Sequence, residues 1–175
     1  MLKKILITGP ESTGKSQLTQ ALARYYHSVY VKEYAREYIA ALDRDYMESD
    51  LLIMAQKQIE LEKQQTLEAD DFLFCDTALT VYEIWSREKY GRTHPWIKQE
   101  IGRITYDLYL LCDVDLPWVE DPQRENPYDR DRLLSLYQQS FNERNIEYFM
   151  VRGKGDSRLK NAIEIIESKF KNVNT

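Results

Sequence analysis

The sequence predicts an α/β fold in which helices flank a parallel β-sheet. Short apolar segments alternate with amphipathic segments along the chain, which is the pattern of a parallel sheet covered by helices. A glycine-containing loop at residues 9–16 joins the first apolar segment to the first helical one. The 175 residues show no repeat, linker or low-complexity run, so residues 1–175 are expected to form one domain.

Five segments have the length and the β-branched or aromatic content of strands. They are residues 3–8, 28–33, 71–76, 106–112 and 146–151. Between them, apolar residues recur every three or four positions, which indicates helices with one buried face. These helices are predicted at residues 16–26, 34–42, 48–69, 78–90, 95–104, 130–144 and from about 156 onward. Ligands of such folds bind outside the carboxyl ends of the strands, so functional residues are expected there.

The loop after the first strand reads Gly-Pro-Glu-Ser-Thr-Gly-Lys-Ser and fits the pattern G-x-x-x-x-G-K-[ST]. The predicted strand before this loop and the predicted helix after it give the context that a phosphate-binding loop requires. Glycines let backbone N–H groups approach phosphate oxygens, and the helix start adds the positive end of its dipole. Lys15 is expected on the outer phosphates and Ser16 on Mg²⁺. The residues predicted to bind ATP here are Gly9, Pro10, Glu11, Ser12, Thr13, Gly14, Lys15, Ser16 and Gln17.

The overall composition argues against several classes of partner. The net charge is −5 and no long basic run occurs, so neither nucleic acid nor an anionic membrane surface is an expected partner. No apolar stretch has membrane-spanning length and the first residues lack a signal-peptide core, so a cytoplasmic protein is expected. Cys75 and Cys112 are expected to be buried free thiols. The sequence leaves the oligomeric state open, a homo-oligomer included.

Three acidic residues end predicted strands: Glu33, Asp76 and Asp113. A Mg²⁺ that bridges two phosphates takes a protein hydroxyl and a carboxylate, directly or through water. Asp76 and Asp113 compete for that carboxylate position beside Ser16. The motif context favours Asp76, which precedes Thr77 and a helix, although an aspartate there can also serve as a helix N-cap.

Glu33 opens the segment Glu-Tyr-Ala-Arg-Glu-Tyr at residues 33–38. A carboxylate at this place can accept the proton of an attacking hydroxyl, and Tyr34 and Tyr38 can wall a pocket for a planar base. The same residues are equally compatible with an ordinary first helical turn that carries acids near its start and aromatics in the core.

Residues 113–132 contain three prolines and several arginines and are predicted to form a mobile lid. Arginines in a lid can neutralise the charge that develops on a transferring phosphoryl group, and Arg124 is the first candidate, with Arg130 and Arg132 as alternatives. A solvated loop with incidental arginines is the other interpretation. The turn at residues 152–158 would pass under the adenine and contribute Arg158, or is a plain connection.

Together these stretches resemble the kinase domain of bacterial NadR-type NAD-biosynthesis proteins, a P-loop kinase of an AAA-type ATPase-like family that phosphorylates ribosylnicotinamide with ATP. The matching residues are 7–16, 33–38, 74–77, Trp85, 90–91, 106–111, 116–118 and Arg124. The resemblance implies a P-loop NTPase fold of the nucleoside and nucleotide kinase type, with a five-stranded parallel sheet whose third and fourth strands flank the first. It also implies an acceptor site lined by Glu33, Tyr34, Arg36, Glu37, Tyr38 and Asp76.

The expected activity is therefore transfer of the γ-phosphoryl group of Mg·ATP to the 5′-hydroxyl of ribosylnicotinamide. In this interpretation Lys15, Glu33, Asp76 and Arg124 carry the catalysis, and Ser16 and Asp76 hold the metal. Two alternatives remain at this level. One is a kinase for another nucleoside or small alcohol, and the other is an ATP-binding regulatory or sensor module that acts on a partner.

Overall fold

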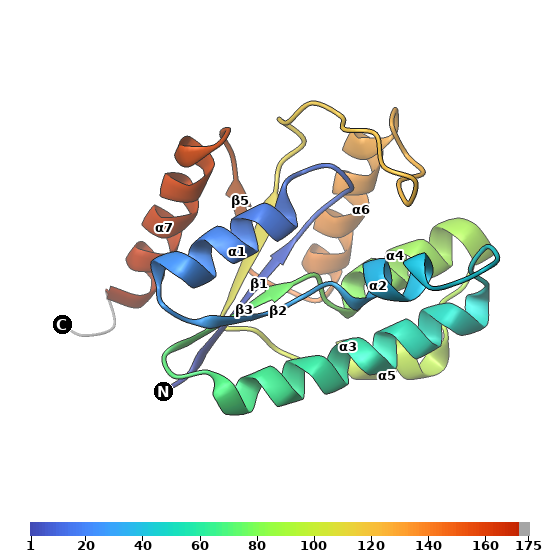
Figure 1. Cartoon of the computed structure of the whole chain (residues 1–175), viewed down its shortest axis with the longest axis horizontal. Coiled ribbons are helices and arrows are strands. Elements are labelled where there is room, and N and C mark those ends of the chain that lie inside the picture. The colour runs from blue at the N-terminus through green and yellow to red at the C-terminus, as the bar shows by residue number, and fades with distance from the viewer. Residues whose placement is uncertain (172–175) are drawn as a thin grey trace.

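The computed structural model describes residues 1–171 and contains a five-stranded sheet with the strand order β2-β3-β1-β4-β5 (Figure 1). The strands are β1 (Lys3–Thr8), β2 (Val29–Val31), β3 (Phe72–Asp76), β4 (Leu108–Cys112) and β5 (Phe149–Val151). All four pairings are parallel, and β1 lies between β3 and β4 with Ile7 opposite both Asp76 and Leu110. The expected placement of the third and fourth strands on either side of the first is confirmed.

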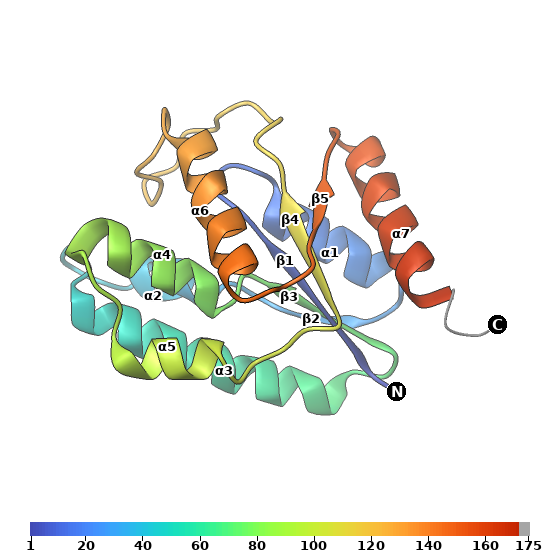
Figure 2. The same cartoon turned by 180° about the vertical axis from the view of Figure 1, so that it is seen from behind.

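Helices cover both faces of the sheet, as the two opposite views in Figures 1 and 2 show. Helices α1 (Lys15–Tyr25) and α7 (Asp156–Lys171) pack on one face. The other face is covered by α3 (Glu48–Glu68), α4 (Leu79–Tyr90), α5 (Pro95–Ile101) and α6 (Arg130–Glu143), while the short α2 (Tyr34–Ala40) follows β2. The predicted alternation of apolar strands and amphipathic helices thus forms a parallel sheet with helices on both faces.

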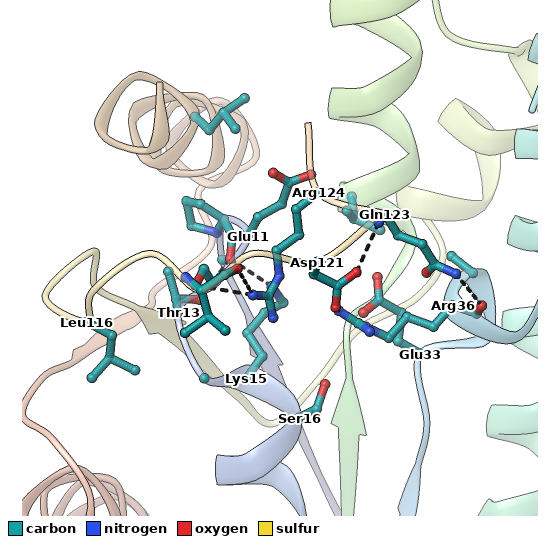
Figure 3. Close-up of a pocket in the computed structure, with 18 of the residues that line it drawn as sticks. Glu11, Thr13, Lys15, Ser16, Glu33, Arg36, Leu116, Asp121, Gln123 and Arg124 are labelled. Carbon is teal, nitrogen blue, oxygen red and sulfur yellow. Dashed lines mark hydrogen bonds and ion pairs between the residues drawn. The ribbon is translucent and has the colours of Figure 1, made fainter. Parts of the chain in front are cut away.

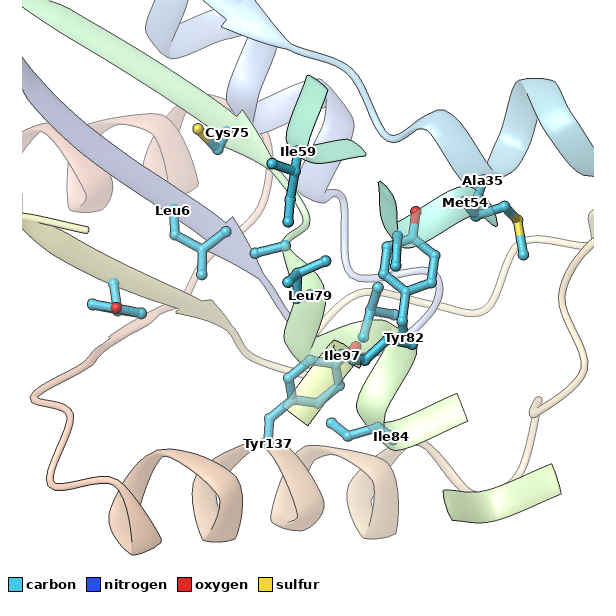
Figure 4. Packing of buried hydrophobic residues seen from close by; sticks show 14 of the residues in the cluster. Leu6, Ala35, Met54, Ile59, Cys75, Leu79, Tyr82, Ile84, Ile97 and Tyr137 are labelled. Carbon is cyan, nitrogen blue, oxygen red and sulfur yellow. The ribbon is translucent and has the colours of Figure 1, made fainter. Parts of the chain in front are cut away.

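Side-chain alternation along the strands divides the core into two halves. In β1, Leu6 joins the cluster beneath α3 to α6, whereas Ile5 and Ile7 join the cluster beneath α1 and α7. Figure 4 shows the first half, where Leu6 and Tyr82 lie among side chains from the surrounding helices. Cys75 and Cys112 are buried free thiols in opposite halves, so the sheet itself separates them.

The two edge strands are shorter than the sequence predicts. Residues 28–33 and 146–151 were each expected as six-residue strands, but β2 and β5 have three residues each. An edge strand has one neighbour, so its outer residues gain fewer ladder hydrogen bonds and leave the sheet earlier. Among the described residues, no helix combines the length and the apolar character needed to cross a bilayer.

The carboxyl ends of the strands place the β1–α1 loop, the ends of β2 and β3, and the start of the segment after β4 along one edge of the sheet. Figure 1 shows the segment between β4 and α6, drawn in yellow to orange, along the same edge of the molecule as the β1–α1 loop. The strand order therefore brings the predicted site residues into one region.

Candidate active site

The β1–α1 loop has the backbone conformation of a phosphate-binding loop because glycine occupies its two critical turns. Gly9 has a φ of +140°, and a Cβ atom there would lie 2.9 Å from the Cys112 carbonyl oxygen at the end of β4. Gly14 has a φ of +74° directly before α1. Positive φ and close backbone approach both favour glycine, so the loop can wrap tightly and point N–H groups inward.

Lys15 and Ser16 stand at the first turn of α1, where the phosphate tail of a nucleotide would end. The Lys15 Nζ donates a hydrogen bond to the Pro10 carbonyl oxygen at 2.7 Å, and Thr13 Oγ1 donates to the same oxygen at 2.8 Å. The lysine is therefore folded over the loop and held by a neutral acceptor. A phosphate oxygen is a stronger, charged acceptor for the same ammonium group.

Arg158 lines neither of the cavities at this site and instead contacts the backbone of the loop. Its side chain is 4% exposed, and it donates to the Thr13 carbonyl oxygen at 2.7 Å and to Asp115 Oδ1 at 2.6 Å. A further bond to the Asp113 carbonyl oxygen at 3.0 Å ties the loop to the segment after β4. The prediction that Arg158 contacts ATP stays a prediction; the contacts observed here are with the protein backbone and Asp115.

Asp76 and Glu33 bring two carboxylates to the start of α1. Asp76 is 3% exposed at the end of β3, and burial raises its pKa, against a hydrogen bond from Ser16 and the charge of Lys15. Burial also raises the pKa of Glu33, with the Lys15 charge opposing and the Asp76 charge adding to the rise. A shared cation would stabilise both carboxylates in their charged form.

Thr77 fixes the direction in which the chain leaves β3. Its φ is +69°, an unfavourable conformation for a β-branched residue, and its N–H donates to the Ile7 carbonyl oxygen at 2.9 Å. Its hydroxyl lies 3.4 Å from Asp76 Oδ1. The strained turn thus keeps the end of β3 joined to β1 at the position where Asp76 faces Ser16.

Asp113, the competing candidate for the metal, is occupied elsewhere. Its Oδ2 accepts a hydrogen bond from Arg152 Nε at 2.8 Å, and its Oδ1 accepts one from the Val114 N–H at 2.8 Å. Burial alone would raise the pKa of Asp113, but these two bonds lower it. The contacts favour Asp76, whose side chain is the one that meets Ser16.

A cavity of about 510 Å³ lies between the loop, α2, α4 and the segment that follows β4. Figure 3 shows Glu33, Arg36 and Asp121 grouped on one side of it, facing Lys15 and Arg124. Its farther walls are apolar and come from α2, α4 and α6: Ala35, Ile39, Val81, Ile84, Trp85, Leu133 and Tyr137. A second cavity of about 370 Å³ shares Ser16, Glu33 and Arg36 with the first and adds Asp76. Such a cavity, apolar at one end and charged at the other, suits a small molecule with a ring and a polar tail.

Residues 113–129 form the roof of this cavity, which Leu116, Pro117, Val119, Asp121, Gln123 and Arg124 line. The mobility expected of the lid at residues 113–132 stays a prediction. Ser12, with a φ of +54°, is the main attachment on the loop side. Its Oγ accepts the Val119 N–H at 3.0 Å, and its carbonyl oxygen accepts Arg130 Nη1 at 3.1 Å. The Glu11 carboxylate accepts the N–H groups of Glu125 at 3.2 Å and Asn126 at 3.0 Å.

The roof is attached to α2 as well. Arg36 Nη2 lies 2.8 Å from Asp121 Oδ2, and this hydrogen bond lowers the pKa of Asp121. Gln123 Nε2 donates to the Arg36 carbonyl oxygen at 3.1 Å. Asp121 and Gln123 were not singled out by the sequence analysis, because an irregular segment has no periodicity that identifies its inward side chains.

Arg124 extends from the roof over the phosphate loop. Its Nη1 donates to Ser12 Oγ at 3.4 Å and to the Val119 carbonyl oxygen, and its guanidinium lies 5.9 Å from the centre of the Trp118 ring. Arg130 lies 5.8 Å from the same ring, and Arg132 pairs with Glu88 at 2.6 Å. Arg124 lines the cavity, whereas neither alternative arginine does.

Only one of the two tyrosines predicted to wall the pocket lines a cavity. Tyr38 lines neither cavity; its hydroxyl donates to Asp50 Oδ1 at 2.8 Å, in a cluster with Arg44 at the start of α3. Tyr34 and Glu37 line the smaller cavity. The carboxylate of Asp50 is buried and therefore requires hydrogen-bond donors, and the Tyr38 hydroxyl is one of them. The Tyr38 side chain accordingly points toward α3 instead of the cavities.

Trp85 is the converse case. The sequence assigned it no place in the site, but its side chain lines the larger cavity near Ile84 and also packs edge-to-face against Tyr82, with 6.0 Å between ring centres. A residue on the apolar face of a helix can border both the core and a pocket, and helical periodicity cannot separate the two positions. Leu133 and Tyr137 on α6 were missed for the same reason.

A family model described as an AAA domain matches residues 4–158 of this chain. The chain belongs to this AAA-domain family. The match includes the loop, both carboxylates and the roof segment, and it agrees with the AAA-type resemblance expected from the sequence.

This chain is 27% identical over 175 aligned residues to the trifunctional NAD biosynthesis/regulator protein NadR of Escherichia coli strain K12. The alignment covers 94% of this chain and 42% of that protein, so the chain spans less than half the length of this relative. The likeness to NadR that the sequence motifs indicate is thereby confirmed.

Solved structures give the same fold. A crystal structure of NadR protein in complex with NR matches with a TM-score of 0.79 at 21% identity, covering 95% of this chain and 50% of that chain. A crystal structure of NadR protein in complex with NAD and AMP-PNP matches with a TM-score of 0.80 at 20% identity, covering 97% of this chain and 49% of that chain. Thymidylate kinase from Ehrlichia chaffeensis matches with a TM-score of 0.66 at 13% identity, and the match covers 95% of this chain and 98% of that chain. The fold is that of P-loop nucleoside and nucleotide kinases.

Proposed function

We propose that this AAA domain is an ATP-dependent kinase that phosphorylates the 5′-hydroxyl of nicotinamide riboside to give nicotinamide mononucleotide. The observation that carries the proposal is the meeting of Lys15, Ser16 and Glu33 at the charged end of one cavity, with Asp76 beside them. Similarity to NadR, whose structures contain NR and AMP-PNP, supports the choice of acceptor and donor.

The proposed reaction assigns one task to each group. The loop amides and Lys15 hold the β- and γ-phosphates, and Arg124 neutralises charge that develops on the transferring group. Glu33 accepts the proton of the acceptor hydroxyl as its oxygen bonds to the γ-phosphorus. The bond from that phosphorus to the β–γ bridging oxygen breaks, and ADP leaves with the bonding electrons.

The donor atoms beside the loop fit a magnesium ion. Mg²⁺ prefers oxygen ligands and binds through one or two protein groups together with substrate phosphates. Ser16 offers a hydroxyl, and the buried Asp76, which interacts with that hydroxyl, offers a carboxylate. When bound, the ion would neutralise phosphate charge and lower the cost of keeping Asp76 ionised.

The apolar end of the cavity would take the ring of the acceptor, and α2 its sugar. Arg36 and Asp121 close that region on the roof side through their 2.8 Å contact. Tyr34 and Glu37 border the adjoining cavity and complete the proposed acceptor site.

A panel of nucleosides incubated with the protein and Mg·ATP tests the proposal, with ADP and phosphorylated product both quantified. We expect product from nicotinamide riboside at a kcat/KM at least about tenfold above that of other nucleosides. Preferential phosphorylation of another nucleoside or a small alcohol would support the alternative kinase. ADP release that needs no acceptor and depends on an added protein would instead support a sensor module.

A further inference from the structure

The backbone on either side of Glu33 lacks a local anchor. Strand β2 ends at Val31 and α2 begins at Tyr34, so Glu33 lies in a two-residue connection as the N-cap of the helix. No side chain within that connection caps α2, because the Glu33 carboxylate faces the cavity instead of the helix amides. The first N–H groups of α2 therefore need an acceptor from another element.

Gln58 on α3 supplies that acceptor and a donor as well. Its Oε1 accepts the Tyr34 N–H at 2.8 Å, and its Nε2 donates to the Lys32 carbonyl oxygen at 3.0 Å. The side chain is 2% exposed, so water cannot easily replace either bond. One buried amide thus holds the backbone groups directly before and directly after Glu33.

The amide orientation follows from the two partners. Turned by 180°, the Gln58 side chain would set its oxygen against the Lys32 carbonyl and its NH₂ against the Tyr34 N–H, which are two repulsive pairs. Each bond restricts the backbone on one side of Glu33. Because the carboxylate is attached between two fixed points, its range of positions relative to Ser16 and Lys15 is narrow.

We infer that Gln58 is a positioning residue for Glu33 and sets the distance between this carboxylate and the acceptor hydroxyl. The inference rests on the proposed kinase function. Gln58 touches neither cavity, so its effect must pass through the backbone of residues 32–34. A displacement of about 1 Å in a catalytic group can lower a rate by about 10²-fold.

Gln58→Met tests the inference, because methionine keeps the volume and removes both hydrogen bonds. We expect kcat to fall about 10- to 100-fold, while the affinity for the non-hydrolysable analogue AMP-PNP changes less than twofold. The matched control is Glu62→Met, one turn further along α3. Glu62 is also buried and bonds Lys4 Nζ at 3.0 Å and the Tyr106 hydroxyl at 2.7 Å, away from the cavities. This control should lower the melting temperature and leave kcat within about twofold.

Gln58→Glu provides a second test in case Gln58→Met does not fold. As a carboxylic acid it can still donate to the Lys32 carbonyl and accept the Tyr34 N–H, whereas as a carboxylate it loses the donor and sets a charged oxygen against that carbonyl. If Gln58→Met does not fold, kcat is compared between Gln58→Glu and the wild type from acidic to alkaline pH. A kcat ratio that falls as the pH rises would support the inference, and a ratio of one at every pH would overturn it. Equal kcat losses in Gln58→Met and Glu62→Met would also overturn it, because they would mark a general stability effect.

The wild-type protein separates this inference from the proposed function. If it phosphorylates none of the nucleosides, the proposed function fails and the role of Gln58 fails with it. If the wild type is active and Gln58→Met has the same kcat, the positioning role alone is overturned.

Discussion

The floor and the roof of the cavity are built in different ways. The floor consists of the β1–α1 loop and Asp76, which belong to the inner strands β1 and β3, and of Glu33, which follows the edge strand β2. The roof, residues 113–129, has no regular structure and is held by hydrogen bonds and ion pairs to Ser12, Glu11 and Arg36. Buried strands place groups within narrow limits, whereas contacts such as the half-exposed Arg36–Asp121 pair are weak and reversible.

This difference assigns separate tasks to the two regions. In the proposed reaction the floor would hold the phosphates and carboxylates in the same place in every cycle, which requires a rigid part of the fold. The roof would admit ligands and then exclude water, which requires contacts that break at small cost. Changes in the floor should therefore affect the reaction itself, and changes in the roof should affect it less.

The largest effect is expected for Lys15→Ala. This change removes the loop ammonium that would hold the outer phosphates, so kcat/KM should fall by about 10³-fold or more. Steady-state kinetics with nicotinamide riboside and Mg·ATP measures it. Lys160→Ala on the exposed side of α7 is the control and should behave as the wild type. An active Lys15→Ala enzyme would remove the phosphate loop from the proposed mechanism.

Glu33→Gln should have the next largest effect. The amide keeps the size of the side chain but cannot accept a proton, so kcat should fall about 10²- to 10⁴-fold. Binding of AMP-PNP, measured by calorimetry, should change little because the loop is untouched. Glu60→Gln, which removes an exposed carboxylate from α3, is the control. A kcat within twofold of the wild type would mean that another group takes the proton.

The roof should respond more weakly. Arg124→Ala removes one charge from above the phosphate loop, and we expect kcat to fall about 10- to 100-fold while ATP affinity drops less. Arg124→Lys keeps the positive charge and loses the planar guanidinium, so its kcat should lie between those of the wild type and Arg124→Ala. An Arg124→Ala enzyme with unchanged kcat would leave the roof as a passive cover.

The smallest effect on turnover is expected for Asp50→Asn, outside both regions. Hydrogen bonds from Arg44, the Met47 N–H and Tyr38 lower the pKa of Asp50, with the Arg44 bond as the largest cause. Its contribution to stability is therefore complete above the unfolded carboxyl pKa of about 3.9 and is lost as the pH falls below it.

The asparagine variant should lose about 1 to 3 kcal/mol of unfolding free energy at neutral pH, as urea titration would measure. Its stability should then fall less steeply than that of the wild type as the medium is acidified. Equal acid slopes in the two proteins would contradict the role given to Asp50. A large loss of kcat would contradict the separation of this cluster from the site.

The sequence predicted the floor better than the roof for physical reasons. Strand periodicity, the glycine spacing and an acid at each strand end are local signals, and the parallel topology brings them together at one edge. The position of the roof was predictable from its length and prolines. Its attachments through Asp121 and Gln123 were not, because irregular backbone can point any side chain inward.

Residues on helices show where pattern reasoning fails. Tyr38 and Trp85 both occupy partly buried helical positions, yet Tyr38 serves the Asp50 carboxylate while Trp85 borders the cavity. Deciding between these roles requires knowing which element lies opposite each helix. That depends on the packing of α2 and α4 against α3, for which the local sequence contains no signal.

The left-handed turn at Thr77 has a consequence for engineering the protein. A β-branched residue at a φ of +69° costs about 1 to 2 kcal/mol that glycine would avoid. Against that saving, glycine would increase the backbone entropy of the unfolded chain and loosen the turn beside Asp76. A screen that measures thermal stability alone would therefore not detect the loss of a fixed turn beside Asp76, on which the proposed reaction depends.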